Sequence, residues 1–212
     1  MPKYLLKKKD NWPKRLIGLT GPMCAGKSAV ARLISQEGIP VLDVDCLARE
    51  VVKPGSEVLQ RLVRTTQRDI LKSDGSLDRA RLLDLMLSGD EIKKNVEGIM
   101  HPEIYRLMDK RLQSLAEAGA GMVFVEVPLL FEAGWEDMFD FIITVSAPEE
   151  LCMERLVRRN DIEPQKARDW FKWQMPPEEK SRRADYIIFN DLDLDSLKSQ
   201  VMKLIGILKA KK

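Results

Sequence analysis

Short, continuous apolar runs separated by amphipathic stretches set the pattern of this chain. Each run has the length of a strand, and we expect these runs to be buried strands of a parallel sheet. Strands that alternate with helices predict an α/β fold with helices on both faces of the sheet. The predicted strands cover residues 15–19, 41–43, 122–127, 141–145 and 186–189.

Helical periodicity fills most of the remaining sequence. Turn signals divide residues 56–118, and His101-Pro102 is expected to open the long helix of that segment. Asp45 is placed to cap the helix that follows the second predicted strand. The predicted helices cover residues 28–36, about 45–52, 103–118 and 194–208, and a charged helical stretch runs from 149 to 183.

Composition narrows the class of protein. The chain has 212 residues, of which 44% are hydrophobic, and this suits one domain with a subdomain or lid. A net charge of +2 gives no strong case for nucleic acid or membrane as a partner. Cys24, Cys46 and Cys152 form no zinc-ligand spacing and suit a reducing compartment. Because neither a signal peptide nor an apolar stretch of membrane-spanning length is recognisable, we expect a soluble, cytoplasmic protein.

A phosphate-binding loop lies between the first predicted strand and the first predicted helix. Residues 21–28 read Gly-Pro-Met-Cys-Ala-Gly-Lys-Ser and match G-x-x-x-x-G-K-[ST]. In such a loop, backbone N–H groups and a helix N-terminus bind phosphate oxygens, while Lys27 reaches the β- and γ-phosphates and Ser28 ligates Mg²⁺. The motif therefore predicts binding of a nucleoside triphosphate. The predicted ATP-binding residues of the loop are Gly21, Cys24, Ala25, Gly26, Lys27, Ser28 and Ala29.

The motif does not specify the reaction, and three classes compete. A regulatory GTPase usually carries N-K-x-D and D-x-x-G motifs, which the sequence lacks. A motor or AAA-type ATPase normally has a longer chain and a carboxylate pair at the end of the third strand, where this sequence has only Glu126. A small-molecule kinase needs an acceptor pocket and a mobile lid with arginines. Both can be placed in this sequence, so we favour the kinase class.

Two carboxylates end the second predicted strand. Asp43 and Asp45 would lie at the C-terminal edge of the sheet, where α/β proteins bind their ligands. One of them can accept the proton of an attacking hydroxyl or hold Mg²⁺ through water. Alternatively, Asp45 is a helix cap and Asp43 a surface turn residue. A capping carboxylate can still face the crevice, and we favour a functional Asp45.

Arginines cluster on the helix after the fourth predicted strand. Arg155 shares a helix face with Arg158 and Arg159. Their planar side chains suit the charge that develops on a transferring phosphoryl group. A solvated basic face explains these arginines equally well.

Several short motifs follow one another at specific spacings. They are Gly18-Leu-Thr-Gly21 with Gly26-Lys-Ser28, Asp43-Val-Asp45 followed by Leu47-Ala-Arg-Glu-Val-Val52, His101-Pro-Glu-Ile104, Val127-Pro-Leu-Leu-Phe-Glu-Ala-Gly134, Arg158-Arg-Asn-Asp161, Gln174, and Ala184-Asp-Tyr-Ile-Ile-Phe-Asn190. In this order the motifs resemble the dephospho-CoA kinase family over nearly the whole chain after residue 13. The sequence departs from the family at Pro22 and Cys24, where the family loop usually has glycines.

The resemblance implies transfer of the ATP γ-phosphate to the ribose 3′-hydroxyl of dephospho-CoA, giving coenzyme A and ADP, with Mg²⁺ as cofactor. It implies Asp45 as general base, with Lys27 and Ser28 serving the phosphates and Mg²⁺. Arg159, or alternatively Arg155, would stabilise the transferring charge. The resemblance also places Asn190 near the adenine. The residues expected on the acceptor side are Asp43, His101, Leu129, Leu130, Phe131 and Glu132.

The implied fold is a three-layer P-loop kinase fold with a five-stranded parallel sheet, a helical substrate-binding insert and a lid. A basic N-terminal extension is expected over residues 1–13 and a kinase domain over 14–212. Within the kinase domain, the core covers 14–55, 119–148 and 185–212, the insert 56–118 and the lid region 149–184.

The expected partners are ATP and dephospho-CoA, without nucleic acid or membrane, and the expected state is a monomer or weak homo-oligomer. Two alternatives stay open. One is a kinase of the nucleoside monophosphate type with a different acceptor, and the other is a nucleotide-binding regulatory protein with little transferase activity.

Overall fold

The computed structural model describes residues 7–67 and 69–210 of the chain, which form two compact units. The larger unit consists of the described parts of Lys3–Asp43 and Leu112–Lys212, and the smaller unit is Val44–Arg111. Residues 1–6 of the predicted basic extension lie outside the described residues, whereas Trp12 is buried in the structure. Among the described residues, no helix is both long and apolar enough to span a membrane.

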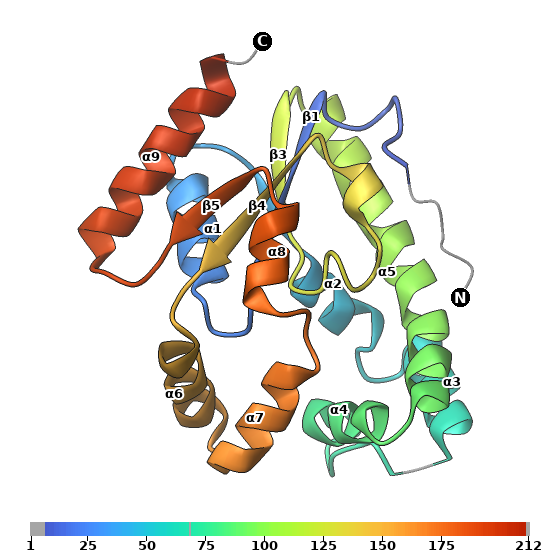
Figure 1. The fold of residues 1–212 in the computed structure, drawn as a ribbon. Coiled ribbons are helices and arrows are strands. Elements are labelled where there is room, and N and C mark those ends of the chain that lie inside the picture. Colours follow the sequence, from blue (N-terminus) through green and yellow to red (C-terminus); the bar gives the residue numbers. More distant parts are fainter. Residues whose placement is uncertain (1–6, 68, 211–212) are drawn as a thin grey trace. The chain divides into compact units, whose positions relative to one another are not determined.

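A five-stranded parallel sheet forms the centre of the larger unit, as predicted (Figure 1). The order of its strands is β2-β3-β1-β4-β5, so the first strand lies in the middle with two strands on either side. The strands are β1 (Arg15–Thr20), β2 (Val41–Asp43), β3 (Met122–Glu126), β4 (Phe141–Ser146) and β5 (Tyr186–Phe189). Because all are parallel, their C-terminal ends meet at one edge, where ligands bind in folds of this type.

Helices cover both faces of this sheet. On one face, α1 (Lys27–Gln36) and α9 (Leu194–Ala210) pack on a core to which every second residue of a strand contributes, such as Ile17 and Leu19 of β1. On the other face α8 (Pro177–Arg183) packs against β4 (Figure 1). On this face β1 presents Leu16 and Gly18. A Cβ at Gly18 would lie 2.8 Å from the side chain of Leu130, so the absence of a side chain there makes room for Leu130.

The charged stretch after β4 forms three helices. They are α6 (Glu149–Asn160), α7 (Pro164–Lys172) and α8, and α6 packs against α7. The breaks between them follow from the sequence. Asp161 ends α6 in the left-handed conformation, with φ of 50°, and Pro164 and Pro177 lie in the first turns of the helices that follow.

The smaller unit is helical. Its helices are α2 (Val44–Val51), α3 (Glu57–Thr66), α4 (Arg79–Leu87) and most of α5 (Asp90–Glu117), which continues into the larger unit. Side-chain caps set two of the helix starts, because Ser56 accepts from the N–H of Leu59 and Asp78 from that of Arg81. Asp45 is the second residue of α2, two positions after the N-cap position 43, so the prediction that it caps this helix is wrong.

The prediction that a helix opens after His101-Pro102 is also wrong. Helix α5 begins at Asp90 and continues through Pro102. A proline inside a helix removes one backbone hydrogen bond and costs about 3 kcal/mol. The buried side chains of Val96, Ile104 and Met108 lie on both sides of the proline, and their packing outweighs this local cost.

Candidate functional site

The phosphate loop connects β1 to α1, and its backbone conformation requires both motif glycines. Gly21 has a φ of 146°, and a Cβ there would lie 2.3 Å from the carbonyl oxygen of Val145. Gly26 has a φ of 100°, and a Cβ there would lie 2.0 Å from Nδ2 of Asn190. Cys24 adopts the left-handed region as well, with a φ of 59°, although it carries a side chain. The loop thus keeps its shape where the sequence departs from the glycine-rich pattern.

The lysine of the motif lies folded over its own loop. Lys27 is buried, and its Nζ donates to the carbonyl oxygens of Gly21 at 3.0 Å and Pro22 at 2.9 Å. Both acceptors are neutral carbonyls, so a triphosphate held in the loop would offer the ammonium group a stronger, charged partner.

The serine of the motif contacts a carboxylate that the sequence analysis did not assign to the site. The hydroxyl of Ser28 donates to Oε1 of Glu126 at 3.0 Å, and Glu126 is 6% exposed. Glu126 ends β3, beside Leu19 of β1 and Asp43 of β2 in the parallel register. The place of Glu126 at the end of a predicted strand was the signal that could have identified it. The end of a strand next to β1 lies beside the start of the phosphate loop.

On its other side the loop is held by β5 and α6. The Asn190 side chain donates from Nδ2 to the carbonyl oxygen of Ala25 at 2.8 Å. Arg155 donates from Nη1 to the carbonyl oxygen of Cys24 at 3.3 Å. Arg158 and Arg159, predicted on the same helix face, are exposed. Of the three arginines, Arg155 is therefore the one that the structure brings to the loop.

The segment after α7 also contacts the loop. Gln174 is buried, and its Oε1 accepts from the backbone N–H of Met23 at 2.9 Å. The next residue, Met175, donates its N–H to Oε1 of Glu132 at 2.9 Å. In the sequence Gln174 is recognisable only as part of a motif, without a predicted role.

Glu132 also forms an ion pair with a buried lysine. Nζ of Lys180 lies 2.9 Å from Oε1 of Glu132 and donates to the carbonyl oxygen of Pro128, also at 2.9 Å. The Lys180 side chain is 0% exposed and that of Glu132 is 17% exposed. Burial lowers the pKa of Lys180, and the carboxylate of Glu132 opposes that effect. The pair fixes α8 on the loop that follows β3.

The other residues predicted on the acceptor side differ in burial. Leu130 is completely buried against Gly18 of β1, and Phe131 is buried beneath the guanidinium of Arg183, which lies 4.8 Å from the ring centre. Leu129 is half-buried. Side chains as buried as Leu130 and Phe131 pack inside the protein and shape the loop that carries them.

Two predicted residues belong to the smaller unit. Asp45 is exposed in the first turn of α2. His101 is half-buried on α5, where burial chiefly, and the charge of Lys93 to a lesser extent, lower its pKa. One helical turn earlier, burial raises the pKa of Glu97. The imidazole of His101 is therefore biased toward its neutral form.

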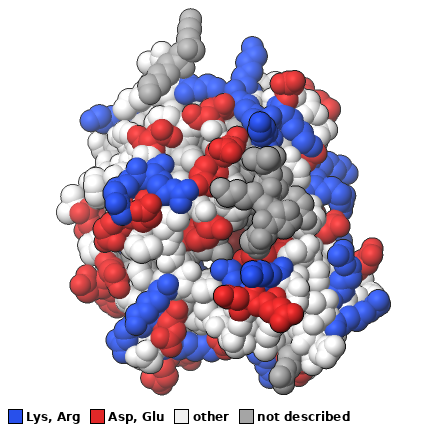
Figure 2. Space-filling view, turned by 45° about the vertical axis from the view of Figure 1, so that its right-hand side comes forward, with Lys and Arg blue, Asp and Glu red and all other residues white. Residues whose placement is uncertain are grey.

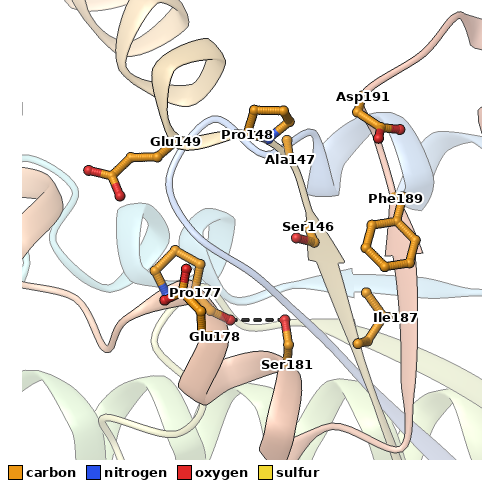
Figure 3. Close-up of a pocket in the computed structure, with 10 residues that line it drawn as sticks. All are labelled: Ser146, Ala147, Pro148, Glu149, Pro177, Glu178, Ser181, Ile187, Phe189 and Asp191. Atoms are coloured by element: carbon orange, nitrogen blue, oxygen red, sulfur yellow. Dashed lines mark hydrogen bonds between the residues drawn. The ribbon is translucent and has the colours of Figure 1, made fainter.

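A pocket of about 460 Å³ opens on the α8 face of the sheet, between the ends of β4 and β5 and the starts of α6 and α8 (Figure 3). Ile187 and Phe189 form its apolar floor, while Glu149, Glu178 and Asp191 add carboxylates. No lysine or arginine lines it among the described residues, so it does not suit a triphosphate. The remaining lining residues are Ser146, Ala147, Pro148, Pro177 and Ser181.

Neither the distribution of charged side chains (Figure 2) nor that of possible metal ligands indicates a second binding site among the described residues. On the face drawn in Figure 2, lysine and arginine are interspersed with aspartate and glutamate. Within residues 7–67 and 69–210, no group of three or more His, Cys, Asp or Glu residues could hold a metal ion.

The parallel sheet, the loop cradled between β1 and α1, and the Lys27 and Ser28 side chains define a P-loop kinase fold. The family model for dephospho-CoA kinase matches residues 15–196. The chain therefore belongs to the dephospho-CoA kinase family.

Individual relatives agree with this assignment. The dephospho-CoA kinase of Syntrophotalea carbinolica is 38% identical over 191 residues, which is 90% of each chain. That of Listeria innocua is 37% identical over 90% of this chain and 96% of its own. Among solved structures, a Thermus thermophilus protein has a TM-score of 0.77 at 35% identity, covering 92% of this chain and 98% of its own. The dephospho-CoA kinase from Campylobacter jejuni has a TM-score of 0.65 at 25% identity, covering 91% of this chain and 96% of its own.

Proposed function

We propose that this protein transfers the γ-phosphate of ATP to the ribose 3′-hydroxyl of dephospho-CoA, giving coenzyme A and ADP. The observation that carries the proposal is a formed phosphate loop, with Lys27 and Ser28 in place, in a chain that matches the dephospho-CoA kinase family over residues 15–196. We further propose that it acts in the cytoplasm as a monomer or weak homo-oligomer, without nucleic acid or membrane as partner.

The larger unit would bind ATP. Backbone N–H groups of the loop and the N-terminus of α1 would receive the β- and γ-phosphates. Lys27 would exchange the carbonyls of Gly21 and Pro22 for phosphate oxygens. Asn190, fixed on Ala25, would lie beside the adenine.

The residues at the start of α1 fit Mg²⁺. This cation takes oxygen ligands, keeps several waters and is usually held by one or two protein groups together with substrate phosphates. Ser28 would supply the hydroxyl ligand, and Glu126, 3.0 Å from that hydroxyl, would orient it. When bound, Mg²⁺ neutralises charge on the phosphates.

The remaining roles concern the acceptor. Asp45 would take the proton of the 3′-hydroxyl, with Asp43 beside it in sequence. Arg155, which already contacts the loop at Cys24, and Arg159 one turn further along α6 would face the transferring phosphoryl group. His101 and residues 129–132 would lie toward dephospho-CoA.

The experiment is ADP release from Mg-ATP with and without dephospho-CoA, beside AMP, CMP and shikimate as rival acceptors. We expect stimulation by dephospho-CoA alone, with coenzyme A as product. Lys27→Ala and Asp45→Asn should each lower turnover at least about a hundredfold, in the range typical for a lost catalytic proton acceptor. Asp137→Asn, at an exposed carboxylate of the larger unit, is the control and should leave turnover unchanged.

Other outcomes would redirect the proposal. Stimulation by a different acceptor would keep the phosphotransfer and discard the substrate. If no acceptor stimulates ADP release, the chain is a nucleotide-binding regulatory protein. Normal turnover in Asp45→Asn would remove Asp45 from the role of base.

A further inference from the structure

Gln174 contacts the phosphate loop next to Cys24, a residue with a side chain that adopts the left-handed backbone region. Its side chain accepts a hydrogen bond from the N–H of Met23 at 2.9 Å, and the residue is 9% exposed. Met23 precedes Cys24, which holds a φ of 59° that costs a residue with a side chain about 1–2 kcal/mol. The peptide segment 23–24 therefore depends on contacts from outside the loop.

Gln174 is itself held in place. The residue after it, Met175, is bound by Glu132, and Glu132 is fixed by the fully buried Lys180. The N–H of Gln174 donates to the carbonyl oxygen of Phe171 at 3.1 Å, in the last turn of α7. With its backbone anchored on both sides, Gln174 acts as a fixed acceptor to which the loop adjusts.

A second contact supports the same peptide segment. Arg155 of α6 donates to the carbonyl oxygen of Cys24 at 3.3 Å. Arg155 and Gln174 both lie within the predicted lid region 149–184, on α6 and between α7 and α8, and they contact consecutive residues of the loop. The position of the lid and the shape of the loop are thereby linked.

We propose that Gln174 is a positioning residue that holds the phosphate loop in its ATP-binding shape through the N–H of Met23, and so couples the segment between α7 and α8 to nucleotide affinity. This inference rests on the proposed binding of ATP at the loop, and it does not depend on the acceptor.

The test compares Gln174→Met with the unmodified protein. Methionine matches glutamine in length but offers no strong acceptor, so the Met23 N–H loses its partner. Gln165→Met is the matched control, because Gln165 is exposed on α7 and its side chain bonds to Asp169 and Arg168 of the same helix. Two quantities are measured for each: hydrogen exchange of the Met23 amide without nucleotide, and the Kd for Mg-ATP by calorimetry.

We expect Gln174→Met to speed exchange at Met23 and to weaken Mg-ATP binding, each by about tenfold, with Gln165→Met within twofold of the parent in both. Unchanged exchange would show that the hydrogen bond does not hold the loop. Faster exchange with an unchanged Kd would show that ATP binding does not need it. Either result overturns the proposal.

A second variant covers the case in which Gln174→Met does not fold. Gln174→Glu keeps an oxygen acceptor in the same place, so exchange at Met23 should stay within about threefold of the parent. Faster exchange in this variant would overturn the proposal. Neither measurement uses dephospho-CoA. A failure of the proposal on Gln174 is therefore distinguishable from a failure of the proposed reaction.

Discussion

The ion pair between the fully buried Lys180 and the partly exposed Glu132 offers a sharp test of how the larger unit is held together. Lys180 is 0% exposed and its Nζ has two acceptors at 2.9 Å, the carboxylate of Glu132 and the carbonyl of Pro128. Glu132→Gln keeps the size of the side chain and an acceptor for the N–H of Met175, but it removes the charge that balances Lys180. Lys180→Met removes the opposite partner.

The two substitutions should differ in cost. Breaking a buried ion pair by removing one partner destabilises a protein by about 3–5 kcal/mol, because an uncompensated charge stays buried. Glu132→Gln leaves the ammonium group of the fully buried Lys180, so we expect the upper part of that range. Lys180→Met leaves a carboxylate that is 17% exposed and still accepts from Met175, so we expect about 3 kcal/mol. In a chain of this length, each 1 kcal/mol lowers the unfolding temperature by roughly 2–4 °C.

The pH dependence supplies an independent check on the cause. Burial lowers the pKa of Lys180 from its ordinary value of 10.5, and Glu132 counteracts this. Without the charge of Glu132, the pKa of Lys180 in the folded state falls further below its value in the unfolded chain. The unfolded state then binds the proton more readily, so stability rises as pH rises toward the unfolded pKa. The stability deficit of Glu132→Gln should therefore shrink between pH 7 and pH 10.

Thermal and urea unfolding followed by circular dichroism, without ligands, measures these differences. The double variant Glu132→Gln with Lys180→Met completes a cycle, and it should cost clearly less than the sum of the two single variants. Additive costs would show that the two residues do not stabilise each other. A Glu132→Gln variant that unfolds within 2 °C of the parent would refute the reasoning on burial.

Two further predictions concern the phosphate loop. Gly26→Ala places a Cβ 2.0 Å from Asn190 at a φ of 100°, so Mg-ATP affinity by calorimetry should fall at least about tenfold. Gly38→Ala is the control, because Gly38 also has a positive φ, of 74°, but has open space around it. A normal Mg-ATP affinity for Gly26→Ala would contradict the described geometry of the loop. Iodoacetamide at pH 8 should label Cys24 and not Cys152, whose pKa burial raises to about 11, and Mg-ATP should protect Cys24. Peptide mass spectrometry measures both, and labelling of Cys152 or unprotected labelling of Cys24 would contradict the prediction.

The sheet was predictable because local signals agreed with tertiary packing. Each of the five strands is a short apolar run with turn signals beside it, and the predicted bounds differ from the observed ones by one residue at most. Helix α5 was mispredicted because Pro102 is a strong local signal for a break. The burial that overrides it depends on side chains brought together by the fold, which the sequence does not show directly.

The phosphate loop was predictable as a motif, whereas the contacts that support its backbone were not. Gly21, Gly26, Lys27 and Ser28 are close in sequence, and their spacing alone indicates phosphate binding. The contacts of the loop with Glu126, Arg155 and Gln174 span many residues of intervening chain. Arg155 was a candidate from its place in an arginine cluster, and Glu126 left a positional signal because it ends the strand that pairs with β1, whereas no sequence pattern indicated the contact of Gln174 with the loop.

The contacts that support the loop also explain why the chain tolerates two departures from the family's glycine-rich pattern. Gln174, Arg155 and Asn190 bind backbone groups, namely the N–H of residue 23 and the carbonyls of residues 24 and 25. A backbone group is present whatever the side chain, so a proline at position 22 or a cysteine at position 24 leaves these partners in place. At Gly21 and Gly26, by contrast, the space for a Cβ is taken by Val145 and Asn190. Glycine is therefore required where the surrounding structure approaches the loop, and replaceable where the loop is held only through its backbone.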